Sequence, residues 1–341
     1  MGTTTLTTLK GLWEKFKAEN PTVRIRDAAK ALNTSEAQLL ATQVGESVTF
    51  LNGDFKGLLK EITSLGYVMA LTRNDHIVHE RKGVYQNISF KGDTGLVLGE
   101  DIDLRLFMQE WNIGFAVVEG NRQSLQFFDK SGSAVHKIYL TERSNMEAYR
   151  TLVKKYTAAV QTDEMEVQPY PEEQGEQEDA NIDVEGFRAA WKNLKDTHAF
   201  FGMLKTFNVS RVQAMRLAPA GFVRQISNEA ARKMLQIASQ TQTEIMVFAG
   251  NRGCIQIHTG TVTKLLESGP WYNVLDPHFN LHLREDKIVS SWIVKKPTED
   301  GDVNSLELFD DKGNNIALFF GKRKPGVPES EMWRKVLASL E

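Results

Sequence analysis

The sequence predicts an α+β fold in which one unit, a mainly antiparallel sheet with packed helices, occurs twice in tandem. Three observations predict it. Motifs recur in the same order in both halves, each half opens with helical periodicity, and each half continues with short segments rich in β-branched and aromatic residues. The chain has 341 residues, enough for about two domains. Helices followed by runs of strands are typical of α+β units.

Repeated motifs indicate the duplication. Near the start of each half, ALNTSEAQ resembles TFNVSRVQ. Further along, ALTRNDHIVHERKGV aligns with VFAGNRGCIQIHTGT, which places Asn74 on Asn251 and, later, DLRL on NLHL. After a slip of four residues, SLQFFDKSG matches SLELFDDKG. Because the anchors keep their order and nearly their spacing, we interpret the chain as two copies of one unit.

The expected boundaries follow from these repeats. We expect a first repeat over residues 1–161, a linker over 162–183 and a second repeat over 184–341. The linker contains nine acidic residues, no basic residue and two prolines. This composition is typical of a self-repelling segment that buries no core. An acidic docking segment is the alternative.

Each half begins with helices and continues with strands. In the second half, Phe187, Trp191, Leu194, His198 and Phe201 recur every three or four residues, which predicts one helix face. The segments EIMVFAG, GCIQIH, FNLHLRE, VSSWIVKK and SLELFD predict strands. FDKSG and FDDKG predict hairpin turns in which glycine supplies a positive φ.

Composition and motifs exclude several classes of function. The formal net charge is −3, so nucleic acid is not the default partner. The sequence has no CxxC, HExxH or CxxCH motif, no phosphate-binding or dinucleotide-binding glycine loop and no GxSxG elbow. Cys254 is the only cysteine, and neither a signal-peptide run nor an apolar run of spanning length occurs. We therefore expect a cytoplasmic protein without membrane insertion.

His198 is the candidate ligand among the seven histidines. Its spacing predicts a mid-helix position on the apolar stripe, flanked by Phe200 and Phe201. A hydrogen-bonded core histidine is the alternative. However, the first copy has Asn-Pro-Thr-Val (20–23) at the corresponding place, so the shared scaffold does not require a histidine there.

Several long motifs together resemble one known family. DTHAFFGMLKTFNVSR, EIMVFAGNRGCIQIHTG, KKPTEDG and SLELFDDKG, with DLRLFMQEW and SLQFFDKSG in the first half, resemble the bacterial cytoplasmic haemin-degrading or haemin-transport factors of the HemS/HmuS type. The resemblance covers nearly the whole chain. It implies one haem b in a cleft between the halves, with an axial histidine from the second copy and an arginine from the first copy facing the other side of the iron. By motif position, these residues are His198 and Arg105.

The resemblance also implies partners for the haem propionates, namely Arg211, Lys296 and Arg323. Haem requires an imidazole for iron, apolar or aromatic walls and cations for its carboxylates. Phe201 is expected to supply wall beside His198. Phe320 stands where the family often has tyrosine, so an apolar wall remains without a phenol hydrogen bond.

Alternation in DLRLF predicts the direction of the first-copy residues. If Leu104 and Leu106 face the core, Arg105 and Phe107 point together into the cleft. Arg105 would be a permanently charged donor able to stabilise charge that develops during porphyrin oxygenation, so Arg105 and His198 are the expected catalytic residues. The alternative for Arg105 is a surface salt bridge to a nearby aspartate.

Three functions remain open at this point. The first is an enzyme that opens the porphyrin with an external electron donor of unknown identity and releases iron for iron acquisition. The second is a haem carrier that buffers haem and transfers it; the partners are then haem and either a haem-uptake transporter or a haem-accepting protein. The third is DNA binding through helix-turn-helix-like segments over 26–40 and 207–217, which the charge of −3 disfavours as the main role.

Overall fold

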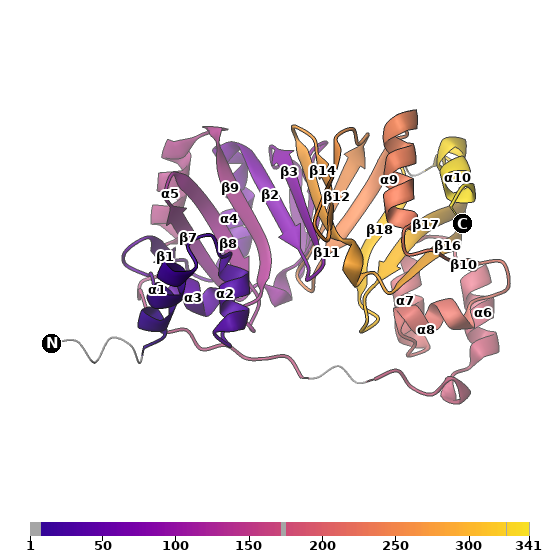
Figure 1. Cartoon of the computed structure of the whole chain (residues 1–341), viewed down its shortest axis with the longest axis horizontal. Coiled ribbons are helices and arrows are strands. Elements are labelled where there is room, and N and C mark those ends of the chain that lie inside the picture. The colour runs from indigo at the N-terminus through magenta and orange to yellow at the C-terminus, as the bar shows by residue number, and fades with distance from the viewer. Residues whose placement is uncertain (1–7, 172–174, 325, 341) are drawn as a thin grey trace. The chain divides into compact units, whose positions relative to one another are not determined.

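The computed structural model describes residues 8–171, 175–324 and 326–340 and divides the chain into two compact units (Figure 1). The first unit contains the described residues up to Arg73, together with Glu80–Pro171 and Asn251–Gln256. The second unit contains Asn74–His79 and the described remainder. Residues 1–7, 172–174, 325 and 341, which belong to the expected repeats and linker, lie outside the description.

The first unit combines helices with antiparallel strands. Its helices are α1 (Leu9–Glu19), α2 (Ile25–Ala31), α3 (Glu36–Ala41), α4 (Phe55–Glu61), η1 (Ile62–Leu65), η2 (Met108–Glu110) and α5 (Met146–Tyr156). Five strands follow the order β1 (Val48–Phe50), β7 (Ile113–Glu119), β8 (Arg122–Phe128), β9 (Ala134–Ser144) and β2 (Gly66–Arg73). Three more strands follow the order β6 (Asp103–Phe107), β5 (Thr94–Leu98) and β4 (Ile88–Lys91).

The second unit repeats this arrangement. Its helices are η3 (Asp179–Asn181), α6 (Val184–Lys192), α7 (Ala199–Thr206), α8 (Arg211–Leu217), α9 (Ala230–Thr241), η4 (Glu285–Lys287) and α10 (Glu331–Ala338). Five strands follow the order β10 (Val223–Ile226), β16 (Ser290–Thr298), β17 (Gly301–Phe309), β18 (Asn315–Gly321) and β11 (Ile245–Gly250). Three more follow the order β15 (Phe279–Arg284), β14 (Trp271–Leu275) and β13 (Leu265–Ser268). Strands β3 (Ile77–Gly83) and β12 (Cys254–Gly260) contribute residues to both units.

The duplicated α+β fold is confirmed at the level of strand register. In the first unit, Phe115 of β7 lies opposite Gln126 of β8. In the second, Trp292 of β16 lies opposite Glu307 of β17. The aligned motifs therefore occupy equivalent places in equivalent hairpins.

The repeated Asn-x-Ser motif has a local physical cause. Asn33 and Asn208 both adopt left-handed backbone conformations, with φ of 52° and 51°. Ser35 and Ser210 then cap α3 and α8, since each hydroxyl accepts a hydrogen bond from the backbone N–H three residues later. Asparagine tolerates positive φ better than most residues, so this sequence fixes a tight turn and a helix start in both copies.

The predicted glycine turns are also confirmed. Gly132 and Gly313 have φ of 77° and 78° in the loops after β8 and β17. In each loop one aspartate, Asp129 or Asp310, accepts two backbone N–H bonds. Each hairpin is thereby closed by the same combination of an aspartate cap and a left-handed glycine.

In the second unit, helices cover both faces of the strands. Leu306 and Leu308 pack in the core that contains α9 and α10, whereas Val294 packs with Phe187 and Trp191 of α6. Figure 1 shows α6, α7 and α8 gathered apart from α9 and α10. Among the described residues, no helix is long and apolar enough to span a membrane.

The expectation of one helix face running from Phe187 to Phe201 is wrong. Helix α6 ends at Lys192 and α7 begins at Ala199, so His198 is the N-cap residue of α7 rather than a mid-helix residue. The Asp196 side chain accepts the backbone N–H of His198 and stabilises a turn between the helices.

The segment predicted as a linker makes contacts with both units. The Met165 carbonyl accepts a hydrogen bond from the side chain of Gln38, and Glu176 forms a salt bridge with Arg216.

Candidate functional site

His198 is presented at the surface of the second unit with one ring nitrogen engaged. Its side chain is 85% exposed. Nδ1 lies 2.7 Å from Oδ1 of Asp196, which also accepts the His198 backbone N–H at 2.9 Å. That backbone hydrogen bond, aided by the ring, lowers the pKa of Asp196, so the carboxylate is ionised and Nδ1 is the donor. Among the described residues, nothing hydrogen-bonds Nε2.

This arrangement fits a metal-ligating imidazole. A carboxylate that accepts Nδ1–H fixes the tautomer, places the lone pair on Nε2 and raises the basicity of the ligand atom. An exposed Nε2 is therefore accessible to a metal centre. The exposed position also differs from the core-histidine alternative, which the structure contradicts.

The two phenylalanines after His198 have different environments. Phe201 is 59% exposed and lies under the ammonium of Lys205, whose Nζ is 4.7 Å from the ring centroid. Phe200 points inward and is almost fully buried, 4.8 Å from Trp191 between ring centroids. Phe201 is thus the member of the pair that offers an open aromatic surface near His198.

Beneath Phe200 lies a buried cluster of three charged side chains. Arg211, the first residue of α8, donates from Nε to Oε2 of Glu307 at 2.7 Å and from Nη2 to Oε1 at 3.0 Å. Lys296 of β16 donates to the same Oε1 at 2.6 Å. Phe200 covers both cations, with its ring centroid 5.4 Å from the guanidinium of Arg211 and 4.7 Å from Nζ of Lys296.

The charges in this cluster differ in accessibility. Arg211 is 24% exposed, whereas the side chains of Lys296 and Glu307 are 3% and 0% exposed. Burial lowers the pKa of Lys296 to about 8, against an opposing effect of Glu307. Burial raises the pKa of Glu307, but Arg211 and Lys296 lower it by more, so Glu307 is ionised. Arg211 is therefore the accessible cation, and Lys296 is a buried partner of Glu307.

Glu307 was missed by the sequence interpretation. In SLELFDD it alternates with leucines, which suggests a solvent-facing strand residue. The available signal was the charge pattern of the predicted hairpin. Lys296 and Glu307 lie on one face of β16 and β17, with Ser305 donating to Oε1 of Glu307 at 2.9 Å between them.

The remaining candidates of the second unit lie near these groups. Arg323 is part-buried and pairs with Asp300 at 3.6 Å, and its charge helps to lower the pKa of Asp196. Phe320 of β18 is half-buried, with its ring centroid 5.1 Å from that of Phe248 and 5.8 Å from Nζ of Lys296. The structure thus brings Arg211, Lys296 and Phe320 together, with Arg323 on the side of Asp196.

In the first unit, the alternation predicted for DLRLF is confirmed. Leu104 and Leu106 are fully buried, while Arg105 and Phe107 are part-exposed on the opposite side of β6. Arg105 forms a salt bridge with Asp103, as the alternative interpretation anticipated. The arginine side chain remains 29% exposed, so this pairing does not remove it from solvent.

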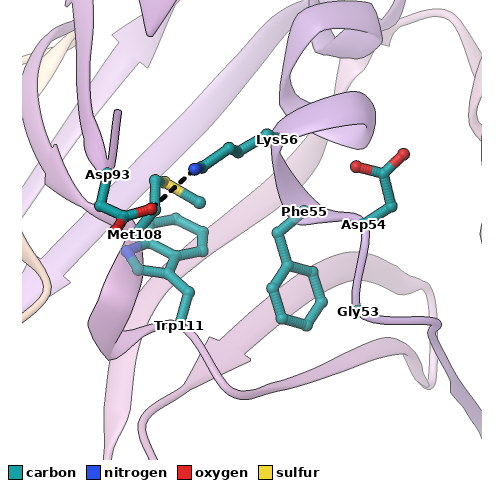
Figure 2. Close-up of a pocket in the computed structure, with 7 residues that line it drawn as sticks. All are labelled: Gly53, Asp54, Phe55, Lys56, Asp93, Met108 and Trp111. Atoms are coloured by element: carbon teal, nitrogen blue, oxygen red, sulfur yellow. Dashed lines mark hydrogen bonds and ion pairs between the residues drawn. The ribbon is translucent and has the colours of Figure 1, made fainter. Parts of the chain in front are cut away.

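A pocket of the first unit lies at a different place from the predicted site residues. Figure 2 shows a pocket of about 270 Å³ at the start of α4, lined by Gly53, Asp54, Phe55, Lys56, Asp93, Met108 and Trp111. Nζ of Lys56 already donates to Asp93 at 2.8 Å and to the Gly92 carbonyl at 2.9 Å. The pocket contains none of the candidate haem residues.

Comparisons with known proteins cover nearly the whole chain. The family model described as the Haemin-degrading HemS.ChuX domain matches residues 33–156 and 208–340. The hemin transport protein HemS of Yersinia enterocolitica is 40% identical over 339 residues, covering 97% of each chain. The hemin transport protein HmuS of Yersinia pestis is 40% identical over 332 residues, covering 95% of this chain and 94% of its own.

Two solved structures are also similar to nearly the whole chain. The holo form of PhuS, a heme-binding protein from Pseudomonas aeruginosa, matches with a TM-score of 0.95 and 43% identity, covering 98% of each chain. The heme degrading enzyme ChuS of Escherichia coli O157:H7 matches with a TM-score of 0.89 and 36% identity, covering 96% of this chain and 97% of its own. PhuS is thus described as a heme-binding protein, and ChuS as a heme-degrading enzyme.

Proposed function

Because this chain belongs to the haemin-degrading HemS/ChuX family, we propose that it binds haem and opens the porphyrin by oxygenation, with dioxygen as the oxidant and electrons from an external donor to activate it, releasing iron. The observation that carries the proposal is the Asp196–His198 pair at the start of α7. It provides one oriented imidazole whose Nε2 is exposed.

Other residues have separate roles in binding. Arg211 and Arg323 hold the propionates, since guanidinium groups match carboxylates with two parallel hydrogen bonds. Lys296 supports this arrangement indirectly, through its hydrogen bond to Glu307. Phe201 and Phe320 supply aromatic wall against the porphyrin.

Bound haem supplies the redox-active iron, and the protein supplies orientation and charge. His198 would hold the iron, and Arg105, with Phe107 beside it on β6, would supply a fixed cation able to stabilise negative charge developed during ring opening. Arg105 cannot lose its proton in practice, so it is a hydrogen-bond donor throughout. Its differential stabilisation of developing charge is what would make the protein an enzyme.

A haem carrier is the second candidate, and one observation favours it. His198 is 85% exposed, so a partner could approach the ligand side chain during transfer. A carrier would receive haem from an uptake transporter or deliver it to an accepting protein. Both candidates require the same ligand, and they differ in whether the porphyrin is consumed.

Titration of the full chain with haemin tests the binding proposal. His198→Ala is expected to lower affinity more than about tenfold and to shift the Soret band, because the axial nitrogen is lost. His278→Ala is the matched control, since His278 is an exposed histidine of the same unit outside the site. An unchanged Soret band and affinity in His198→Ala would assign the ligand to another residue.

A further inference from the structure

The structure holds a buried carboxylate, Glu307, between the two cations nearest the proposed haem carboxylate site. The hydrogen bonds between Glu307 and Arg211 set the orientation of the Arg211 guanidinium. The guanidinium has five N–H donors in a planar fork. Glu307 takes the edge formed by Nε and Nη2. Within the described residues, Nη1 of Arg211 makes no hydrogen bond.

The second edge of that fork is therefore left intact. Nη1 and the remaining Nη2 hydrogen form a second pair of parallel donors, matched to a second carboxylate. The side chain that carries them is 24% exposed, while the carboxylate behind it is 0% exposed. The edge formed by Nε and Nη2 is bound to Glu307, and the outer edge, formed by Nη1 and Nη2, is accessible.

The charge balance favours an anion at this outer edge. Arg211 and Lys296 contribute two positive charges and Glu307 one negative charge. A ligand carboxylate would balance the group.

The duplication shows that packing alone does not require this cluster. The first-copy equivalent of Glu307 is Gln126, which lies opposite Phe115 as Glu307 lies opposite Trp292. Gln126 is also buried and bonds the neighbouring serine hydroxyl at 3.0 Å. The first helical residue after the serine cap is Arg211 in α8 but Glu36 in α3. The fold thus accepts an amide at this strand position. The first copy has a different buried pair nearby, Glu36 with Lys137 opposite Gln126, so the arrangement of two cations around one glutamate is particular to the second copy.

We infer that Glu307 is a positioning residue that holds Arg211 by one edge and so presents its other edge to a carboxylate of the bound porphyrin. This inference rests on the proposed function, because it assigns the partner of that same site. Glu307 does not itself contact the ligand. It acts through the orientation of Arg211.

The test compares haem with its dimethyl ester, which has the same ring and iron but no ionised carboxylates. Each is titrated into wild type, Glu307→Gln and the control Glu329→Gln. Glu329 is a buried glutamate of the same unit that bonds Asn304 and Arg334 outside the cluster. We expect wild type and the control to prefer haem over the ester. Glu307→Gln should lose about tenfold or more in affinity for haem and keep its affinity for the ester.

Arg211→Lys keeps the test decisive if Glu307→Gln does not fold. Arg211 is part-exposed, and lysine keeps its charge but has no second edge to offer. This variant should lose most of the preference for haem over its ester. Equal losses for both porphyrins, tighter haem binding in Glu307→Gln, or no preference in wild type would each overturn the inference alone. A wild type that binds neither porphyrin would overturn the proposed function, and the inference with it.

Discussion

Oδ1 of Asp196 lies 2.7 Å from Nδ1 of His198 and also accepts the His198 backbone N–H, so one carboxylate fixes both the turn before α7 and the orientation of the imidazole. Backbone and ring are aligned by the same group. The orientation of the proposed ligand is therefore set by the protein's own side chains. Such pre-organisation would allow an exposed side chain to serve as a specific iron ligand.

Asp196→Asn tests that relationship. The amide is a weaker acceptor, so Nδ1–H is held less firmly and Nε2 becomes less basic. We expect haem affinity about 10- to 100-fold lower and a lower iron–histidine stretching frequency in the ferrous complex. The measurements are haemin titration and resonance Raman spectroscopy. Asp276→Asn, in the same unit and bonded to Thr263, is the control. An unchanged frequency would show that Asp196 does not influence the ligand.

Arg105→Ala tests the proposed catalytic cation. We expect haem affinity within about tenfold of wild type but ring opening at least about 100-fold slower, as for the loss of one donor to developing charge. Arg105→Lys should recover only part of the rate, because a point charge on a flexible stem does not reproduce the guanidinium fork. Arg122→Ala, an exposed arginine of the first unit, is the control. Degradation at the wild-type rate in Arg105→Ala would remove this residue from the mechanism.

The first unit contains a buried histidine, His136, which we expect to make the folded protein less stable at acidic pH. His136 lies with Nε2 2.6 Å from the Tyr85 hydroxyl and Nδ1 2.8 Å from that of Thr72. Burial lowers its pKa to about 3. Burial also raises the pKa of Cys254 to about 12 and that of Tyr85, so its neighbours are neutral and give the imidazolium no counter-charge.

The sign of the effect follows from proton linkage. Between about pH 6.5 and pH 3 the unfolded chain binds a proton at this histidine and the folded chain does not, so stability falls as the pH falls. Between pH 7 and pH 5 we expect a loss of about 2 kcal/mol from this group. Urea unfolding of wild type and His136→Gln at several pH values measures it. The variant should be less stable at pH 7 but show a shallower decline. Parallel declines would contradict this assignment.

Much of the fold was predictable because its signals are local. Positive φ at Asn33 and Asn208, with a serine cap two residues later, is encoded within a few residues, so the same motif marks the same turn twice. The alternation in DLRLF likewise gave the buried faces of Leu104 and Leu106. Period-2 patterns and helix caps are properties of the strand or turn itself.

The site was less predictable because it depends on tertiary contacts. The helical period from Phe187 to Phe201 continues across a break that Asp196 stabilises through its side chain, and apolar spacing does not report that break. Glu307 meets Arg211 from 96 positions away, and no sequence period links them. Burial of Lys296 depends on Phe200 and Glu307 together. The apolar spacing around His198 likewise did not predict that its side chain is exposed.

We propose that this protein consumes the haem it binds. The most direct test is a single-turnover reaction of the wild-type haem complex with an external reductant and excess catalase, which removes free peroxide, followed by identification of the product. We expect the Soret band to decay and a ring-opened tetrapyrrole to form in an amount close to that of the haem lost. A Soret band that persists once catalase is present would contradict the enzyme and leave the carrier.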